Sequence, residues 1–299
     1  MSFTHLHVAS GFSFKYGTTL PHLLVEQARE LGMVALALTD RDGLSGSIRF
    51  ARACLEYGIA PIIGVNLAID LLADKNNETA LAKDLPRVTV LAHGDGGWRA
   101  LVRFMTGLSM NAVDRKPIIT LELLQRFSEY STQLHLLHGP EAPLSQALVL
   151  HRSDIAYEIF NKTRPFFGDQ AIDCVSHLVA GKGPFSTAHA ARSLIFARDH
   201  DIDAVITNAV RMRDAADGPV ADILDCARQL VPLHQRHLER RNAEGYLKSN
   251  SQMAALAAEV AFAAGERTPR LLLNTTRKWA ERALLSPQRD LGLGAIHLP

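Results

Sequence analysis

The sequence predicts an α/β protein of the (β/α) barrel kind, and three observations carry that prediction. The chain has 299 residues, close to the size of a closed (β/α) barrel of about 250 residues. Residues 3–67 alternate strand-like and helix-like segments, beginning and ending with a strand. The run 34–39 is continuously apolar, as in a strand buried on both faces. Such alternation favours parallel strands with helices outside them.

The elements follow from apolar periodicity and from helix-ending residues. Strands are predicted, in chain order, at 3–9, 34–39, 60–67, 87–92, 134–137, 171–176 and 203–208. Helices are predicted at 19–31, 45–57, 98–108, 185–200, 219–230, 252–264 and 275–285. Thr18 or Thr19 can cap the first helix, and Gly32 ends it. The count of about seven strands agrees with one barrel.

The residue pattern of the chain changes after Val231, where the alternation of strands and helices ends. A dense basic run occupies 234–241, and two helical stretches follow it. We therefore expect a barrel over 1–230 and a helical extension over 231–299. A solvated helical face is the favoured interpretation of the basic run, ahead of a DNA contact, because a glutamate interrupts it and the total charge is balanced.

Composition excludes several classes of protein. Hydrophobic residues make up 47% of the chain and charged residues 21%, which is typical of an ordinary globular protein. The formal net charge is +1, so no global positive field attracts nucleic acid or an anionic membrane. The 3 cysteines form no CxxC pair, so we expect reduced thiols rather than disulfides or a zinc site. The N-terminus lacks a secretory apolar region, and no apolar run reaches membrane-spanning length, which predicts a soluble cytoplasmic protein.

The candidate site follows from where polar residues stand on the strands. Functional groups of parallel barrels lie at the carboxyl ends of strands. His5 and His7, two apart on a strand, project to one face and could start a divalent metal site. The polar loop 39–42, Asn66 and the segment 208–211 follow later strands. A structural role for the histidines and a helix-capping role for the loop remain alternatives.

At this point the chain resembles a known family, the PHP (polymerase and histidinol phosphatase) domain. The resemblance is carried by FTHLHVASGFSFKYG at 3–17, LGMVALALTDRDGLSG at 31–46 and GIAPIIGVNLAI at 58–69. It continues through DAVITNAVRMRDAADGPVADIL, AEGYLKSNSQMAAL and the final strip DLGLGAIHLP. More narrowly, the chain looks like the domain that opens the alpha subunit of bacterial DNA polymerase III and its error-prone, C-family relatives. The resemblance implies a distorted seven-stranded (β/α) barrel of PHP type.

Active members of this family bind a cluster of about three metal ions, and the resemblance assigns the ligand positions one at a time. The HxH pair is present as His5 and His7, and His177 matches a further family histidine. The other matching positions carry residues that differ from the family's ligands. They are Tyr16 for an aspartate, Arg41 for the histidine of TDH, Asn66 for a glutamate, Arg87 for a histidine, and Ala209 and Arg211 for a DxH pair.

These departures predict a metal-free remnant of the family's site. Arginine stays protonated and offers no lone pair to a metal ion. We expect Asp40 and Asp42 to pair with Arg41 or Arg211, so that ion pairs replace metal bridges. On this hypothesis no cofactor is bound.

Three functions compete at this stage. In the first, the chain is the structural PHP portion of a DNA polymerase III alpha-type protein that acts in DNA replication or repair. Its expected partners are the palm and thumb sequence of that protein, DNA, and other replication or repair proteins. No membrane is expected as a partner. In the second it is a phosphoesterase or 3′–5′ exonuclease that uses zinc, manganese or magnesium, with His5, His7 and Asp40 as the surviving ligands. In the third, Arg41, Arg87 and Arg211 bind phosphate or a DNA backbone without hydrolysis. A chain without a polymerase palm is not expected to polymerise DNA, so its status as an enzyme stays open.

Overall fold

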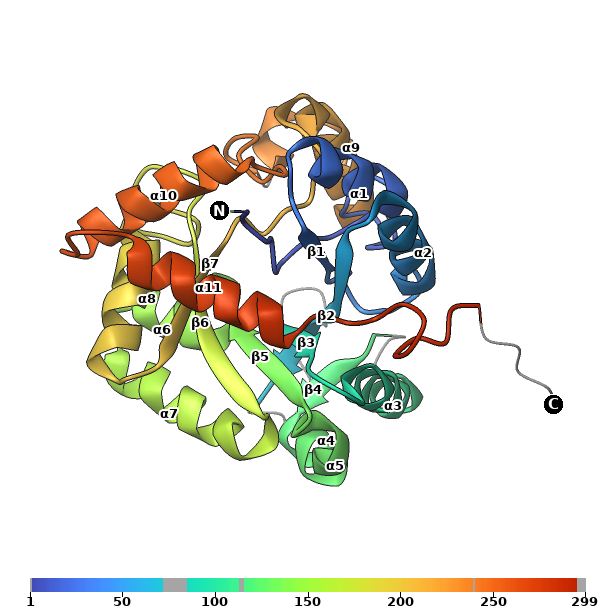
Figure 1. The fold of residues 1–299 in the computed structure, drawn as a ribbon. Helices are drawn as coiled ribbons and strands as arrows, with labels where there is room; N and C mark the ends of the chain where they lie inside the picture. The colour runs from blue at the N-terminus through green and yellow to red at the C-terminus, as the bar shows by residue number, and fades with distance from the viewer. Residues whose placement is uncertain (1, 72–84, 113–115, 239, 295–299) are drawn as a thin grey trace.

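A single curled sheet with helices around its outside forms the centre of the molecule (Figure 1). The computed structural model describes residues 2–71, 85–112, 116–238 and 240–294. Its strands are β1 (Ala35–Leu38), β2 (Ala60–Asp70), β3 (Arg87–Ala92), β4 (Ile118–Thr120), β5 (Leu134–His138), β6 (Asp169–Val175) and β7 (Asp203–Thr207). Its α-helices are α1 (Pro21–Glu30), α2 (Ser47–Tyr57), α3 (Gly97–Met110), α4 (Leu121–Arg126), α5 (Ser128–Ser131), α6 (Pro143–Val149), α7 (Ser153–Thr163), α8 (Thr187–Asp199), α9 (Gly218–Gln229), α10 (Asn250–Ala263) and α11 (Arg270–Arg282). Short 3-10 helices lie at η1 (Arg164–Phe166), η2 (Ala215–Asp217) and η3 (Gln235–His237).

The fold is a curled α/β half-barrel, which confirms the α/β barrel class that the sequence predicts, although β4 was not predicted and one strand runs in an unexpected direction. The sheet order is β1-β2-β3-β5-β6-β7, and β4 pairs with β2 off this path. β1 runs parallel to β2, and β5, β6 and β7 run parallel to one another, as expected. β3 is antiparallel to both of its neighbours, which corrects the expectation of parallel strands throughout. Apolar alternation marks a strand but not its direction, because direction depends on how the chain connects the strands.

The first predicted strand, 3–9, is an extended segment outside the regular ladders. It lies beside β1, where the N–H of Ala37 donates to the carbonyl of His5 (3.0 Å) and that of Thr39 donates to Val8 (2.7 Å). On its other side, the N–H of Val210 donates to the carbonyl of His7 (2.9 Å). The segment therefore connects β1 with the residues that follow β7, and this contact closes the curled sheet.

The interior of the barrel is plugged by α11. One buried apolar cluster takes its members from the first segment and from successive strands, namely Leu6, Ala37, Ile62, Leu91, Leu137, Ala171 and Val205. Trp279, Ala280 and Ala283 of α11 complete this cluster. The Trp279 indole is fully buried, and its Nε1 donates to Asp203 Oδ2 at the start of β7 (2.7 Å). The boundary near residue 231 stays a prediction, but α11 packs into the same core as the strands, and residues 295–299 of the terminal strip lie outside the described residues.

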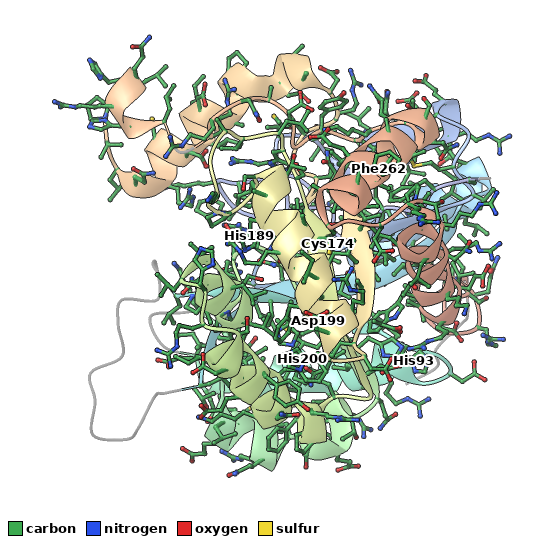
Figure 2. All side chains as sticks on the ribbon, turned by 90° about the vertical axis from the view of Figure 1, so that its left-hand side faces the viewer. His93, Cys174, His189, Asp199, His200 and Phe262 are labelled. Atoms are coloured by element: carbon green, nitrogen blue, oxygen red, sulfur yellow. The ribbon has the colours of Figure 1, made fainter. Side chains whose placement is uncertain are left out.

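Cys54, Cys174 and Cys226 are buried and free of disulfides. Burial raises the pKa of the Cys54 and Cys174 thiols, so both are protonated at neutral pH. Figure 2 shows Cys174 on β6 beneath α8. In the described part of the chain, no helix is long and apolar enough to cross a bilayer.

Two histidines of β5 are buried within the fold. The Nε2 of His138 donates to Gln170 Oε1 (2.8 Å), and burial lowers the pKa of His138 to about 4. Burial, His93 and Arg282 together lower the pKa of His135 to about 3. His135 and His93 have ring centroids 3.9 Å apart, and Figure 2 shows His93 at this lower end of the sheet. Both β5 histidines are therefore neutral in the folded chain.

Replacing Trp279 with alanine should destabilise the whole barrel. The change leaves a cavity in the barrel interior and leaves the Asp203 carboxylate without its indole donor. We therefore expect a loss of about 3–5 kcal/mol in the free energy of unfolding. Urea denaturation followed by circular dichroism measures it. Met110→Ala is the control: that side chain is 82% exposed, so a change within about 0.5 kcal/mol is expected. An equally small effect of Trp279→Ala would contradict the plug.

The buried histidines predict that stability falls as the solution is acidified. Below the ordinary histidine pKa of 6.5, His135 and His138 are protonated in the unfolded chain but stay neutral in the folded chain. The free energy of unfolding therefore falls as the pH is lowered, until the pH approaches about 4. Between pH 7 and pH 5 we expect a loss of roughly 1–2 kcal/mol for each histidine. Urea midpoints at the two pH values measure it. His138→Phe should reduce the pH dependence, whereas the exposed-residue control His22→Gln should leave it unchanged.

Candidate functional site at the barrel mouth

The carboxyl ends of the strands bring most of the predicted site positions together. A small cavity of about 10 Å³ lies there, enough for a single water molecule at most. Its lining residues are His7, Tyr16, Asn66, Arg87, Thr89, Gly139, Pro140, Glu141, Phe185 and Ala209. Of the positions that the family resemblance assigns to metal ligands, five line this cavity, and side chains fill nearly all of the space between them. His5, Arg41, His177 and Arg211 are not among its lining residues.

Arg87 lines this small cavity and is held there by hydrogen bonds. Its Nε donates to Asn66 Oδ1 (2.6 Å), and its Nη2 donates to Asp42 Oδ1 (2.6 Å) and to the carbonyl of Asn66 (2.8 Å). Asp42 sits in a turn with a φ of +61°, and its N–H donates to the carbonyl of Asn66. Burial and the nearby Arg41 lower the pKa of Arg87, and the carboxylates of Asp42 and Glu141 offset only part of this effect. The turn after β1 thus supplies an anion to the first residue of β3.

Arg41 lies beside Arg87 and has its own carboxylate. Its Nη2 donates to Glu141 Oε2 (2.8 Å), and its guanidinium carbon lies 3.4 Å from the centre of the Tyr16 ring. Burial alone would lower the pKa of Arg41, but the Glu141 carboxylate and Tyr16 outweigh burial and raise it. In the same way, burial would raise the pKa of Glu141, but Arg41 and Arg87 hold it below its ordinary value. The pair is therefore ionised on both sides.

Arg211 makes the most complete ion pair of the mouth. Its Nη1 and Nη2 donate to the two carboxylate oxygens of Asp225 (3.0 and 2.9 Å), and Nη2 also donates to the carbonyl of Tyr16. The Asp225 side chain is fully buried and takes a second donor from Arg228 (3.0 Å). The Arg211 guanidinium lies 4.2 Å from the Tyr16 ring centre. Tyr16 thus packs against the guanidinium groups of both Arg41 and Arg211.

Asp40 does not form the ion pair that the sequence suggests. Its carboxylate accepts from the Ser10 N–H (2.6 Å), the Ser10 hydroxyl and the Ser13 hydroxyl (2.7 Å). Burial raises the pKa of Asp40. Arg41 and Arg211 have Glu141 and Asp225 as partners instead, and Asp42 pairs with Arg87. Asp40 points toward the loop that follows the first segment, where hydroxyl and N–H donors satisfy it, so its role here is to hold that loop.

The histidine pair of the first segment divides between two sets of partners. His5 is fully buried; its Nε2 donates to the carbonyl of Lys248 (2.9 Å), and burial lowers its pKa to about 4. His7 lines the small cavity, with its Nδ1 3.3 Å from Asp173 Oδ2. The second oxygen of Asp173, Oδ1, is buried without a hydrogen-bond partner.

His177 lies at the edge of a larger pocket above the small cavity. Its Nε2 donates to the carbonyl of Asn208 (2.8 Å), its ring stacks on Phe185 at 4.8 Å, and burial lowers its pKa to about 4. Across the described part of the chain, no group of three or more His, Cys, Asp or Glu side chains is placed to hold a metal ion.

The larger pocket, about 470 Å³ in volume, carries several arginines. Arg41 and Arg211 line it, together with Arg240 and Arg241 from the basic run 234–241. Arg240 pairs with Asp222 (2.6 Å), whereas Arg241 has no hydrogen-bond or ion-pair partner among the described residues. The basic run was expected to be a solvated helical face. Among the described residues of the run, the 3-10 helix η3 is the regular element, so the helical part of that expectation is wrong, whereas residues 234–236 and Arg241 are exposed to solvent as expected. Arg240 and Arg241 also line the pocket.

Sequence reasoning missed the carboxylates that neutralise the mouth. Glu141 follows β5 at its carboxyl end, where a search of strand ends could have found it. Asp173 is an acid within the otherwise apolar run of β6, and Asp225 is an acid on the buried face of α9. A charged residue at a buried position of a regular element is the signal that marks both.

Comparisons with known proteins identify sequence relatives of this chain. Residues 5–177 match the family model of the PHP domain. The chain is 30% identical over 281 residues to the DNA polymerase III subunit alpha of Treponema pallidum, covering 93% of this chain and 23% of that protein. It is 31% identical over 269 residues to the error-prone DNA polymerase of Symbiobacterium thermophilum, covering 83% of this chain and 23% of that protein. Among solved structures, an amidohydrolase from Chromobacterium violaceum aligns with a TM-score of 0.45 and 12% identity over 71% of this chain and 88% of that one.

The chain therefore spans less than a quarter of either polymerase relative. The family match covers the first segment, the loop after β1 and the strands that carry His7, Arg41, Asn66 and Arg87. On this match and on the barrel that carries it, the chain belongs to the PHP domain family.

Proposed function

We propose that this barrel is the non-hydrolytic PHP portion of a DNA polymerase III alpha-type protein, with ion pairs where active members of the family hold metal ions. The observation that carries the proposal is Arg87, which fills the site between Asn66 and Asp42 and leaves a cavity of only about 10 Å³. A guanidinium cannot ligate a metal ion and repels a divalent cation.

The donor set also supports the absence of a metal cluster. Metal-assisted hydrolysis needs carboxylates or imidazoles that hold the ion and leave a position for water. At the small cavity the lining groups of this kind are His7, which contacts Asp173, and Glu141, which is held by Arg41. The residues present do not fit a metal cluster, and we derive no hydrolytic step for this chain.

The structural role rests on the relatives. Both polymerase relatives continue far beyond the part that this chain matches, and they are named for polymerase activity. We infer that the barrel packs against polymerase palm and thumb sequence and serves DNA replication or repair. The polymerising residues would belong to that remaining sequence, and the barrel would supply a rigid surface for it.

Metal analysis tests the non-hydrolytic proposal. Purified protein dialysed against zinc, manganese or magnesium should retain far less than one ion per chain. It should also not hydrolyse bis-p-nitrophenyl phosphate. The physical reason is that the ion pairs of Arg41, Arg87 and Arg211 occupy the ligand positions. Inductively coupled plasma mass spectrometry and nitrophenol release measure the two outcomes.

A reconstructed variant is the positive control for that experiment. It restores the family's ligand types through the combined substitutions Tyr16→Asp, Arg41→His, Asn66→Glu, Arg87→His, Ala209→Asp and Arg211→His. This variant should bind manganese measurably better than the parent chain. Two or more ions on the parent chain, with turnover that His7→Ala abolishes, would instead establish the phosphoesterase or exonuclease alternative with His5, His7 and Asp40 as its core.

A second candidate function is phosphate or DNA-backbone binding in the larger pocket. The observation that favours it is Arg241, which lines the pocket without a carboxylate partner among the described residues, beside Arg41, Arg211 and Arg240. Guanidinium groups match phosphate geometry. Arg87, expected from the sequence to belong to this set, points into the small cavity instead and is satisfied there.

Arg241→Ala should weaken binding of a fluorescein-labelled oligothymidylate. Losing one phosphate contact is expected to lower the affinity several-fold and to reduce the slope of log K against log salt by about 1. Fluorescence anisotropy at several salt concentrations measures both quantities. Arg52→Ala, an exposed arginine of α2, is the matched control and should change neither. Equal effects of the two substitutions would reject the pocket as the binding site.

A further inference from the structure

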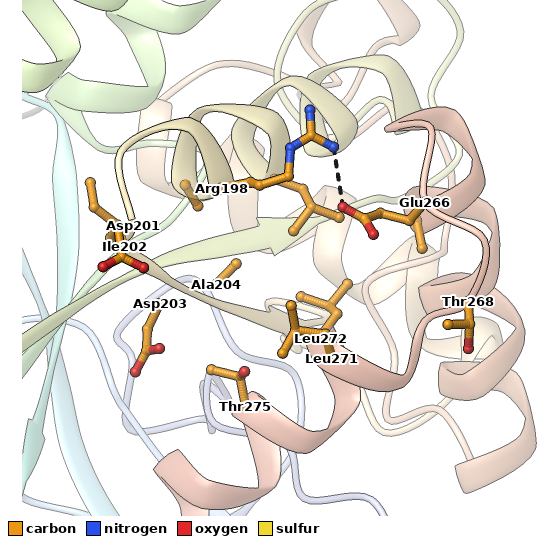
Figure 3. Close-up of a pocket in the computed structure, with 13 residues that line it drawn as sticks. Arg198, Asp201, Ile202, Asp203, Ala204, Glu266, Thr268, Leu271, Leu272 and Thr275 are labelled. Carbon is orange, nitrogen blue, oxygen red and sulfur yellow. Dashed lines mark hydrogen bonds and ion pairs between the residues drawn. The ribbon is translucent and has the colours of Figure 1, made fainter.

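A groove on the side of the barrel lies away from the arginine-lined mouth. Figure 3 shows it between the end of α8, the start of β7, the end of α10 and the first turns of α11. Its volume is about 250 Å³, below the roughly 300–1,000 Å³ of a typical small-molecule pocket.

The floor of the groove is apolar. Leu194, Ala261 and Leu272 line this floor and are largely buried. Leu271 stands at the rim, and 73% of its surface is exposed. On the neighbouring helix α10, Phe262 is also exposed, at 60%, and Figure 2 shows it on the outer side of that helix. Exposed apolar side chains next to an apolar hollow mark interaction sites.

The charged rim is mostly acidic. Of the charged lining residues, Asp201, Asp203 and Glu266 are acidic and Arg198 is basic. Figure 3 shows Arg198 and Glu266 joined across one side, where Nη1 lies 3.2 Å from Oε1. Arg198 also lies 3.4 Å from Asp199. Arg198, the basic residue of the groove lining, therefore has two carboxylate partners.

The other side of the rim keeps an unpaired negative charge. Asp203 accepts a hydrogen bond from Trp279 (2.7 Å), but the indole brings no positive charge. Asp201 has no side-chain hydrogen bond or ion pair with any described residue. The helices α8 and α10 both end at the groove, and their carboxyl ends add partial negative charge, against the amino end of α11.

We propose that this groove binds a basic segment of a partner polypeptide. One bulky apolar side chain of the segment lies on the floor formed by Leu194, Ala261 and Leu272, and an adjoining lysine or arginine lies beside Asp201. The volume suits one anchoring side chain, which is how hot spots of protein interfaces are built. The charge of the rim selects a cationic segment over an acidic one. The proposal does not depend on the function of the barrel mouth, which lies at the opposite ends of the strands.

Two hexapeptides that differ only in charge test the proposal. Fluorescein-labelled Gly-Lys-Leu-Trp-Lys-Gly-amide should bind the full chain, and Gly-Glu-Leu-Trp-Glu-Gly-amide should bind at least tenfold more weakly. Fluorescence anisotropy measures both affinities. Asp201→Asn should weaken the basic peptide about fivefold, and Leu271→Ala should weaken it by a similar factor. Both side chains are exposed, so neither change is expected to disturb the fold.

The matched control is Glu158→Gln, which removes a carboxylate from the exposed face of α7 and should leave peptide binding unchanged. Equal binding of the two peptides, or unchanged binding to Asp201→Asn and Leu271→Ala, overturns the proposal. Sedimentation equilibrium distinguishes another occupant: a dimer that Leu271→Ala dissociates would assign the groove to a second copy of this chain and also overturn it.

Discussion

A curled sheet has two open ends, and the packing of this molecule depends on how each end is filled. Protein interiors reach the density of organic crystals, so an empty barrel end would lose contacts on every strand. At the lower end the Trp279 indole fills the space and is satisfied by Asp203. At the mouth, charged side chains do the filling, with Arg87 held between Asn66 and Asp42. The two ends use opposite chemistry for the same requirement.

Filling a barrel end with guanidinium groups imposes a strict condition on the neighbouring residues. A buried cation is costly unless a carboxylate and further acceptors surround it. The mouth meets this condition one arginine at a time: Glu141 serves Arg41, Asp42 serves Arg87, and Asp225 serves Arg211. The three carboxylates come from different parts of the chain: Glu141 follows β5, Asp42 follows β1, and Asp225 lies on α9. Arg41 and Arg87 therefore depend on their carboxylates and the carboxylates on them, and restoring a metal ligand at either position would remove the cation that pairs with Glu141 or Asp42.

The sequence was informative about elements and about which positions converge, and less so about partners. Apolar runs located β1, β2, β3, β5, β6 and β7 within a few residues, but β4 was not predicted and the predicted strand 3–9 lies outside the regular ladders. The family motifs placed His7, Asn66 and Arg87 at one cavity, as the structure finds. Alternation could not predict the reversed direction of β3, because both directions bury the same side chains. The pairing of Asp40 with an arginine was wrong because Asp40 neighbours Arg41 in sequence but points toward Ser10 and Ser13. Which carboxylate meets which arginine depends on tertiary contacts that sequence spacing does not record.

The balanced total charge conceals a local separation of charge. The formal net charge of +1 excludes a global field that attracts nucleic acid. Charges separated by more than about 10 Å are screened from each other at ordinary salt, so each surface acts through its own residues. The mouth offers Arg241 as a cation without a carboxylate partner among the described residues, whereas the side groove offers Asp201 as an anion without a cationic one. A neutral chain can therefore present one surface suited to phosphate and another suited to a basic peptide, and exclusion by composition applies to the molecule as a whole rather than to its faces.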